Sequence, residues 1–192
     1  MKTMTTDQIE TFNNLYKTAT ERVDKIIVLG NYRVRRVGFF DKRNLKKSIK
    51  DYEQCLRMAP GHWQSMLFMA KSHQRLGDHE AALLWLEKAM QIETTSHTIP
   101  QEASIEAVHL NNIDKGILFS AEAIRRKPND FALLGNHAMN LLIAGRDDDA
   151  KRTVELAIEL NPSDTVNKNI LKQITDVTSG RKKRPTCKDI VG

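Results

Sequence analysis

The sequence has few of the features that mark exported or membrane-bound proteins. It contains only two cysteines, Cys55 and Cys187, and a pair so far apart is not a disulfide framework. The N-terminus reaches polar residues at once, unlike a secretory signal, and no stretch approaches the roughly 18 apolar residues of a membrane-spanning helix. We therefore expect a soluble, non-exported, cytoplasmic protein, in which Cys55 is a small buried apolar residue rather than a reactive thiol.

Glycine and histidine are too scattered for the common catalytic motifs. No two of the nine glycines lie closer than Gly30 and Gly38, whereas phosphate-binding loops need closely spaced glycines. A zinc protease would need a second histidine four positions after His79, where Leu83 stands. No G-x-S-x-G segment occurs. We expect no enzyme activity, no metal site and no cofactor.

The charge is concentrated near the two ends. The chain has 192 residues, 40% of them hydrophobic, and a net charge of +6, which suits one domain or a short repeat array with its own core. Residues 33–50 carry a net charge of +7 and residues 181–192 a net charge of +4. The rest of the chain is therefore mildly acidic, with a net charge of −5.

A period of 34 residues runs through the sequence. Pro128 and Pro162 lie one period apart, and Pro60 lies two periods before Pro128. Turn-forming residues keep the same period at Gly77, Asn111 and Gly145. Small residues keep it in three columns: Cys55, Ala89, Ala123 and Ala157; Ser48, Ala82, Gly116 and Ala150; and Ala70, Ser104 and Ala138. Such self-similarity is typical of a repeat architecture.

Each column has a physical reason. Two antiparallel helices approach closely only where neither has a bulky side chain, so we expect Ala70 to face Ala82, and the small residues of later repeats to pair likewise. Glycine and asparagine tolerate the left-handed backbone common at helix ends. The prolines end the second helix of each pair. A single pair cannot bury its apolar face, so stacking stabilises the array.

The chain resembles the tetratricopeptide repeat family. Residues 76–82 and 144–150 look like the family's turn and second-helix opening, and residues 123–128 and 157–162 look like its second-helix ending. The resemblance covers roughly residues 44–177. The family's usual first-helix aromatic is replaced by Met66, Pro100 and Leu134, and Pro100 predicts a late start for its helix. The resemblance implies an all-α solenoid of three to four antiparallel helix pairs that acts as a scaffold, adaptor or chaperone for a protein partner.

The sequence divides into three parts. Residues 1–62 hold an amphipathic helix over 7–28, with a capping box from Thr5 to Gln8, then an insertion over about 30–43 and a second helix over 44–59. Residues 63–177 hold three repeats, 63–94, 97–128 and 131–162, and a capping helix over 165–177. Residues 178–192 are predicted to be a flexible basic tail.

In this family the first helices line a concave groove, which implies a peptide-binding surface here. The residues predicted to line it are Gln64, Leu67, Phe68, Lys71, Arg75, Thr98, Gln101, Glu102, Ile105, Val108, His109, Ala132, Gly135, Asn136, Met139 and Leu142. Apolar surface with a polar rim favours an extended or helical peptide. In an alternative interpretation, Ile105, Met139 and Leu142 only pack under the capping helix.

Some family members clamp the acidic carboxyl ends of heat-shock chaperones with lysine and asparagine side chains. The matching positions here are Leu67, Lys71, Glu102, Ala132 and Asn136. Asn136 alone fits, and Glu102 would repel a carboxylate. We expect no such clamp.

The basic segment offers a second hypothesis, an RNA-binding or other anion-binding module. Its candidate residues are Arg33, Arg35, Arg36, Lys42, Arg43, Lys46 and Lys47. Phe39 and Phe40 lie beside these cations, as backbone-tracking nucleic-acid sites require. The alternatives are a solvated loop whose two phenylalanines cover the end of the stack, or an acidic protein partner. Trp63 and Trp85 are expected to pack, or to form a contact on the convex face.

Overall fold

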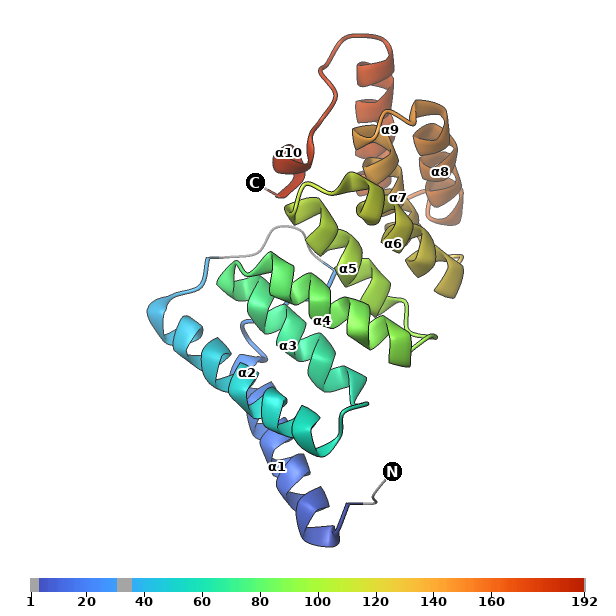
Figure 1. Ribbon diagram of the computed structural model, residues 1–192. Coiled ribbons are helices and arrows are strands. Elements are labelled where there is room, and N and C mark those ends of the chain that lie inside the picture. Colours follow the sequence, from blue (N-terminus) through green and yellow to red (C-terminus); the bar gives the residue numbers. More distant parts are fainter. Residues whose placement is uncertain (1–3, 31–35, 192) are drawn as a thin grey trace. The chain divides into compact units, whose positions relative to one another are not determined.

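The computed structural model describes residues 4–30 and 36–191, and all regular secondary structure in these ranges is α-helical (Figure 1). These ranges contain α1 (Thr6–Val23), α2 (Phe39–Met58), α3 (Trp63–Leu76), α4 (His79–Ile92), α5 (Thr98–His109), α6 (Ile113–Arg126), α7 (Phe131–Ile143), α8 (Asp147–Leu160), α9 (Thr165–Thr178) and α10 (Cys187–Val191). They form two compact units that meet in sequence between Thr94 and Thr95. The predicted all-α architecture of packed helix pairs is confirmed. None of the helices within the described ranges is long and apolar enough to cross a membrane.

The turns inside the three helix pairs share one backbone geometry. Gly77, Asn111 and Gly145 have φ angles of 84°, 57° and 80°. In each turn the next residue donates its N–H to the carbonyl five positions earlier, which satisfies carbonyl groups at the helix end. The turn column predicted from the 34-residue period is therefore confirmed.

The small residues lie where the helices of a pair meet. Ala70, Ala82, Ala138 and Ala150 are buried. In the middle pair, the Oγ of Ser104 on α5 donates a hydrogen bond of 2.9 Å to the carbonyl of Gly116 on α6. A Cβ at Gly116 would come within 3.3 Å of Val108 Cγ2, so a larger residue would push the helices apart.

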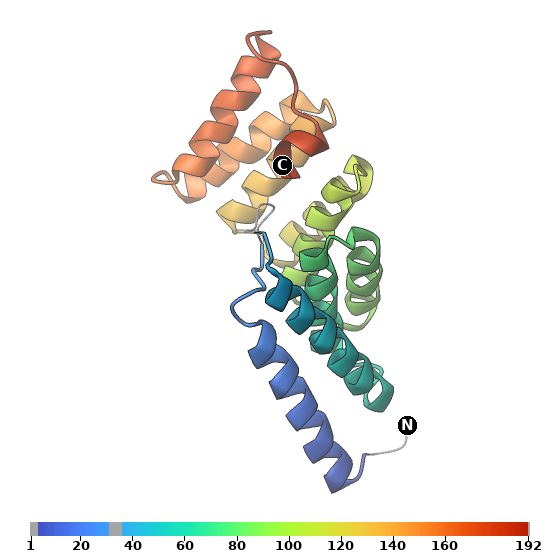
Figure 2. The same ribbon diagram turned by 90° about the vertical axis from the view of Figure 1, so that its left-hand side faces the viewer.

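In the first unit, α1 lies alongside α2 in both views (Figures 1 and 2). The predicted Thr5–Gln8 capping box is present, since Thr5 N–H donates to Gln8 Oε1 and Gln8 N–H donates to Thr5 Oγ1. Ser48 Oγ donates to the carbonyl of Ala19 at 3.0 Å. Ala19 and Ser48 thus form the close contact of this helix pair. They lie 29 positions apart in sequence, whereas the corresponding residues Ala70 and Ala82 lie 12 positions apart.

Helix α2 begins earlier than the sequence predicts. Its first residue is Phe39 rather than residue 44, so the end of the expected 30–43 insertion is helical. The physical reason is the cap at Gly38, whose N–H donates to the carboxylate of Asp41 at 3.0 Å. The basic residues from Lys42 onward are therefore on a helix, not in a loop.

In the second unit, α9 packs on α7 and α8 as a closing helix. Leu141 and Leu142 form a core cluster with Ile170 and Ile174. Helix α5 begins at Thr98, one position after the start that the 34-residue period gives from Trp63. Pro100 lies in its first turn, where N–H groups have no acceptor within the helix, so the proline is tolerated there.

The C-terminal segment differs from the flexible tail that the sequence predicts. Arg184 donates to the carbonyl of Leu142 at 2.6 Å and to both carboxylate oxygens of Asp147 at 2.5 and 2.8 Å. Pro185 and Cys187 are buried, and α10 contacts α5. The guanidinium and the two apolar side chains hold the segment against the rest of the second unit. Figure 1 shows the chain turning back after α9, so that α10 lies near α5.

Candidate functional site

The predicted groove residues of the first unit lie along one face of α3. Gln64, Phe68 and Arg75 are partly exposed, whereas Leu67 and Lys71 are only 6% and 1% exposed. Lys71 and Arg75 each interact with another group of the protein. Only part of the predicted column therefore offers surface to a ligand.

Phe68, which is partly exposed, belongs to a cluster of rings. Its ring stacks on Tyr52 with centroids 6.2 Å apart and meets Tyr16 edge-on at 6.4 Å. His62 meets Tyr16 edge-on at 5.0 Å and Phe12 at 4.9 Å. Burial raises the pKa of Tyr16 and lowers the pKa of His62, so both rings are neutral near pH 7. Such a surface offers aromatic contacts and imidazole and phenol hydrogen bonds to a peptide.

The sequence prediction missed Tyr16 and His62 as members of this surface. The close contact between Ala19 and Ser48 shows which residues of α1 correspond to the predicted groove residues of α3. If Ala19 corresponds to Ala70, then Tyr16 corresponds to Leu67 and Thr20 to Lys71. The insertion between α1 and α2 shifts this register, which hides the correspondence from a search for the 34-residue period.

The predicted groove residues of the second unit lie on α5 and α7. On α5, Thr98, Gln101 and His109 are partly exposed, but Glu102 and Ile105 are fully buried. On α7, Asn136 and Met139 are partly exposed.

Other predicted members of this column have packing contacts. Val108 is fully buried, and its side chain lies against Gly116. Leu142 and Met139 pack in the core cluster that contains Ile170 and Ile174 of α9, as the alternative interpretation expects. Gly135 is buried under Asn167 of α9, and Ala132 is exposed.

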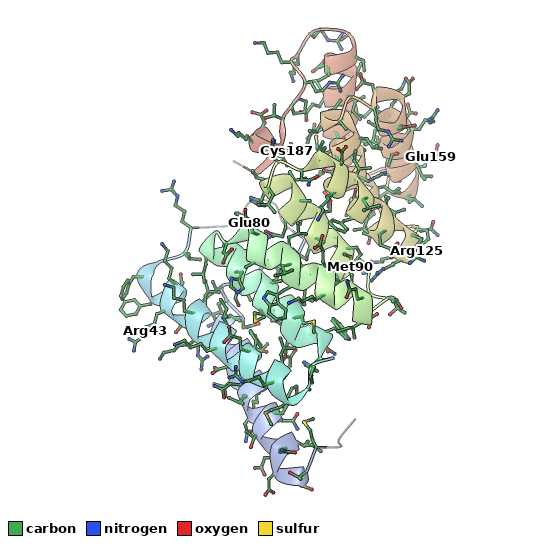
Figure 3. The ribbon with its side chains drawn as sticks, viewed as in Figure 1. Arg43, Glu80, Met90, Arg125, Glu159 and Cys187 are labelled. Atoms are coloured by element: carbon green, nitrogen blue, oxygen red, sulfur yellow. The ribbon has the colours of Figure 1, made fainter. Side chains whose placement is uncertain are left out.

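The basic candidates gather on the outer face of α2. Lys42, Arg43, Lys46 and Lys47 are exposed on this helix, and Figure 3 shows Arg43 pointing away from the helix bundle. Arg36 is exposed just before the helix. Arg33 and Arg35 lie outside the described residues.

Phe39 and Phe40 do not cover the end of the stack. Their side chains are 78% and 75% exposed, so that alternative is wrong. Trp85 packs partly buried against the first-unit core that includes Met69 and Tyr52, and Lys88 Nζ lies 4.1 Å from its ring centre.

The described side chains do not assemble a metal centre. Within residues 4–30 and 36–191, no group of three His, Cys, Asp or Glu side chains could hold a metal ion. Cys55 and Cys187 are both buried free thiols, and burial raises the pKa of each. Their thiols are therefore protonated near pH 7.

The packed helix pairs define an α-helical repeat protein, and comparison with known proteins finds a family model that matches part of the chain. Residues 39–62 and 64–95 match the sequence profile of the tetratricopeptide repeat. Over these residues the chain is therefore similar to tetratricopeptide repeats. No curated protein sequence matches it.

Solved structures share the fold at low sequence identity. The crystal structure of MamA superposes with a TM-score of 0.74 at 15% identity, covering 90% of this chain and 85% of that one. A tetratricopeptide repeat protein from Parabacteroides merdae gives a TM-score of 0.74 at 14% identity, covering 90% and 61%. The first repeat domain of Spaghetti (RPAP3), bound to the HSP90 peptide SRMEEVD, gives a TM-score of 0.57 at 14% identity, covering 61% and 93%. At these identities the likeness concerns the fold.

Proposed function

We propose that this protein is a non-enzymatic scaffold or adaptor that holds a peptide segment of a protein partner on the inward faces of its first helices. The observation that carries the proposal is the ring cluster of the first unit. Tyr16, His62 and Phe68 are partly exposed although they form one apolar cluster. Partly exposed aromatic side chains are the usual energetic centres of protein interfaces.

The peptide's chemistry follows from what surrounds the rings. Gln64, one turn before Phe68 on α3, offers an amide that can donate to and accept from a peptide backbone. Lys17 is exposed beside Tyr16, where it pairs weakly with Glu21 at 3.9 Å. We expect an extended or helical peptide with an apolar or aromatic anchor, rather than a peptide recognised by its charge alone.

A direct test selects 12-residue peptides from a random library on the intact protein and measures the best peptide by fluorescence anisotropy. Tyr16→Ala and Gln64→Ala should each weaken binding, by roughly tenfold or more at a central aromatic position. Leu84→Ala is a matched control, because Leu84 is 50% exposed on the second helix α4. If Leu84→Ala weakens binding and the other two variants do not, the proposal is wrong.

The peptide SRMEEVD provides a second binding test of the proposed function. The RPAP3 domain binds it, but this chain has Leu67 and Glu102 at two of the clamp positions, and both are buried. We therefore expect no binding of SRMEEVD above the level of a scrambled peptide. Tight binding that requires the terminal carboxylate would contradict this expectation.

A further inference from the structure

The outer face of α2 has an aromatic ring at one end of a row of positive charges. A shallow open hollow of about 330 Å³ is lined by Phe39, Lys42, Arg43, Lys46, Lys47 and Lys50. All six side chains are exposed, and Phe39 is 78% exposed. Their spacing of three and four residues places them on one side of the helix. We call this surface the basic face of α2.

Among the described residues, no acidic side chain pairs with the positive charges of the basic face. Within the described part of the chain, none of the five cations forms an ion pair or a side-chain hydrogen bond. Other helices of this protein pair their surface charges: Glu122 holds Arg125 and Arg126, and Asp149 holds Arg146 and Arg152. Like charges three or four positions apart destabilise a helix. The basic face therefore differs from an ordinary solvated surface and suits an external polyanion.

The opposite side of α2 prevents the cations from turning inward. Leu45, Ile49 and Tyr52 are buried in the first-unit core, where α2 packs on α1 and α3. The orientation of the helix is thus determined by apolar burial, and the positive side chains must face outward.

We propose that the basic face of α2 binds single-stranded nucleic acid, with the phosphates along the lysines and a base stacked on Phe39. From Phe39 to Lys50 the face extends about 16 Å along the helix, and Lys42, Lys46 and Lys50 succeed one another at intervals of about 6 Å. This linear arrangement matches a linear polyanion. The exposed ring favours a single strand, because only unpaired bases are available to stack on a protein side chain.

Two other anionic partners use only part of this surface. An acidic peptide would pair with the cations, but its carboxylates would not interact with the ring of Phe39. The Phe39 and Phe40 rings meet edge-on, with centroids 5.8 Å apart. An anionic membrane would need an apolar helix face to insert, and the apolar face of α2 is buried in the unit core. Both partners serve as comparison arms in the test.

The test measures fluorescence anisotropy of labelled 15-nucleotide oligo(U) and oligo(dT) with the full chain at several salt concentrations. Binding should weaken with salt, with a log–log slope of up to about −3.5 if five phosphates are neutralised. Lys42→Ala/Lys46→Ala should reduce affinity by roughly tenfold and make the slope less steep by about 1.4. Phe39→Ala should also reduce affinity by roughly tenfold, whereas Phe39→Trp should keep it.

Lys168→Ala/Lys172→Ala is the matched control. These lysines are exposed on α9 with the same spacing of four, so the double variant removes the same charge elsewhere and should leave affinity within about twofold. An equal loss in both double variants would overturn the proposal, as would no effect of Phe39→Ala. Binding of a 15-base-pair duplex, polyglutamate or phosphatidylserine vesicles as tight as that of the oligonucleotides would overturn it too. Circular dichroism melting establishes that each variant is folded.

Discussion

The side-chain amide of Asn140 on α7 donates a hydrogen bond of 3.0 Å to the Oγ of Ser104 on α5. The same amide also reaches the carbonyl of Gly116 and the Oγ of Ser120 on α6, both at 3.2 Å. Asn140 is 1% exposed. One buried side chain therefore joins two successive helix pairs and makes their register specific, since a shifted packing would leave its amide without partners.

We expect Asn140→Ala to lower the free energy of unfolding by about 2–3 kcal/mol, because it removes several buried hydrogen bonds and leaves a small cavity. Urea denaturation followed by circular dichroism measures the change. Asn136→Ala on the same helix is the control, since Asn136 is partly exposed, and its effect should stay within about 0.5 kcal/mol. Equal effects of the two substitutions would contradict a structural role for the Asn140 cluster.

Gly135 is required for the close approach of the closing helix. A Cβ at this position would lie 2.1 Å from Asn167 Oδ1, and Asn167 donates to the carbonyl of Phe131 at 3.1 Å. We expect Gly135→Ala to destabilise the protein by about 1–3 kcal/mol in thermal or urea unfolding, although alanine favours helix.

Gly61→Ala is the control for this substitution, because a Cβ there meets nothing within 4 Å. Adding Asn167→Ala should recover part of the loss caused by Gly135→Ala, since it removes the clashing oxygen. A double variant less stable than Gly135→Ala alone would mean that the Asn167 hydrogen bond outweighs the clash.

The C-terminal segment can be followed through its own thiol. Cys187 is 3% exposed and lies three positions after Arg184, which pairs with Asp147. We expect Arg184→Ala to open this segment and to raise the rate at which Cys187 reacts with a disulfide reagent by tenfold or more, while Cys55 stays protected. Lys183→Ala removes a neighbouring exposed charge and should leave the rate unchanged. Unchanged protection of Cys187 in Arg184→Ala would show that the ion pair does not hold the segment.

His62 should make stability depend on pH. Its Nδ1 accepts the N–H of Ser65 at 3.2 Å at the start of α3, which requires a neutral nitrogen, and burial lowers its pKa. As the pH falls below about 6.5, the unfolded chain binds a proton before the folded chain does. The contribution of His62 is therefore complete above that pH and is lost as the pH falls through the folded pKa.

We expect His62→Asn, which keeps a capping oxygen and removes the titration, to reduce the fall in unfolding free energy between pH 7.5 and pH 5. Urea titrations at each pH measure it. If the wild type and the variant lose stability in parallel, His62 does not contribute to the pH dependence.

Much of the fold could be predicted because it depends on local features. The 34-residue period places a residue that tolerates a left-handed backbone at Gly77, Asn111 and Gly145, and all three have positive φ. It also places small residues where antiparallel helices must touch, as Ser104 and Gly116 do. Backbone conformation at helix ends and steric limits at helix crossings depend on residue type, so they can be predicted from the sequence.

The candidate sites depended more on tertiary structure. The contact between Ala19 and Ser48, across an insertion that breaks the period, brings Tyr16 beside Phe68. Burial separates the predicted groove column into partly exposed residues such as Gln64 and buried ones such as Glu102. The neighbours and the burial of these residues depend on which helix surfaces meet, and packing between segments distant in sequence decides that.

The amino-acid sequence was sufficient to predict the helix pairs, their turns and the concentration of positive charge near α2. Only the tertiary structure shows that Phe39 stays exposed, and that Arg184 binds Asp147 and holds the C-terminal segment. The physical reason is the distance in sequence between the interacting groups. Helix, turn and charge patterns arise from neighbours in the chain, whereas exposure and ion pairing across 37 positions arise only when the folded backbone brings the groups together.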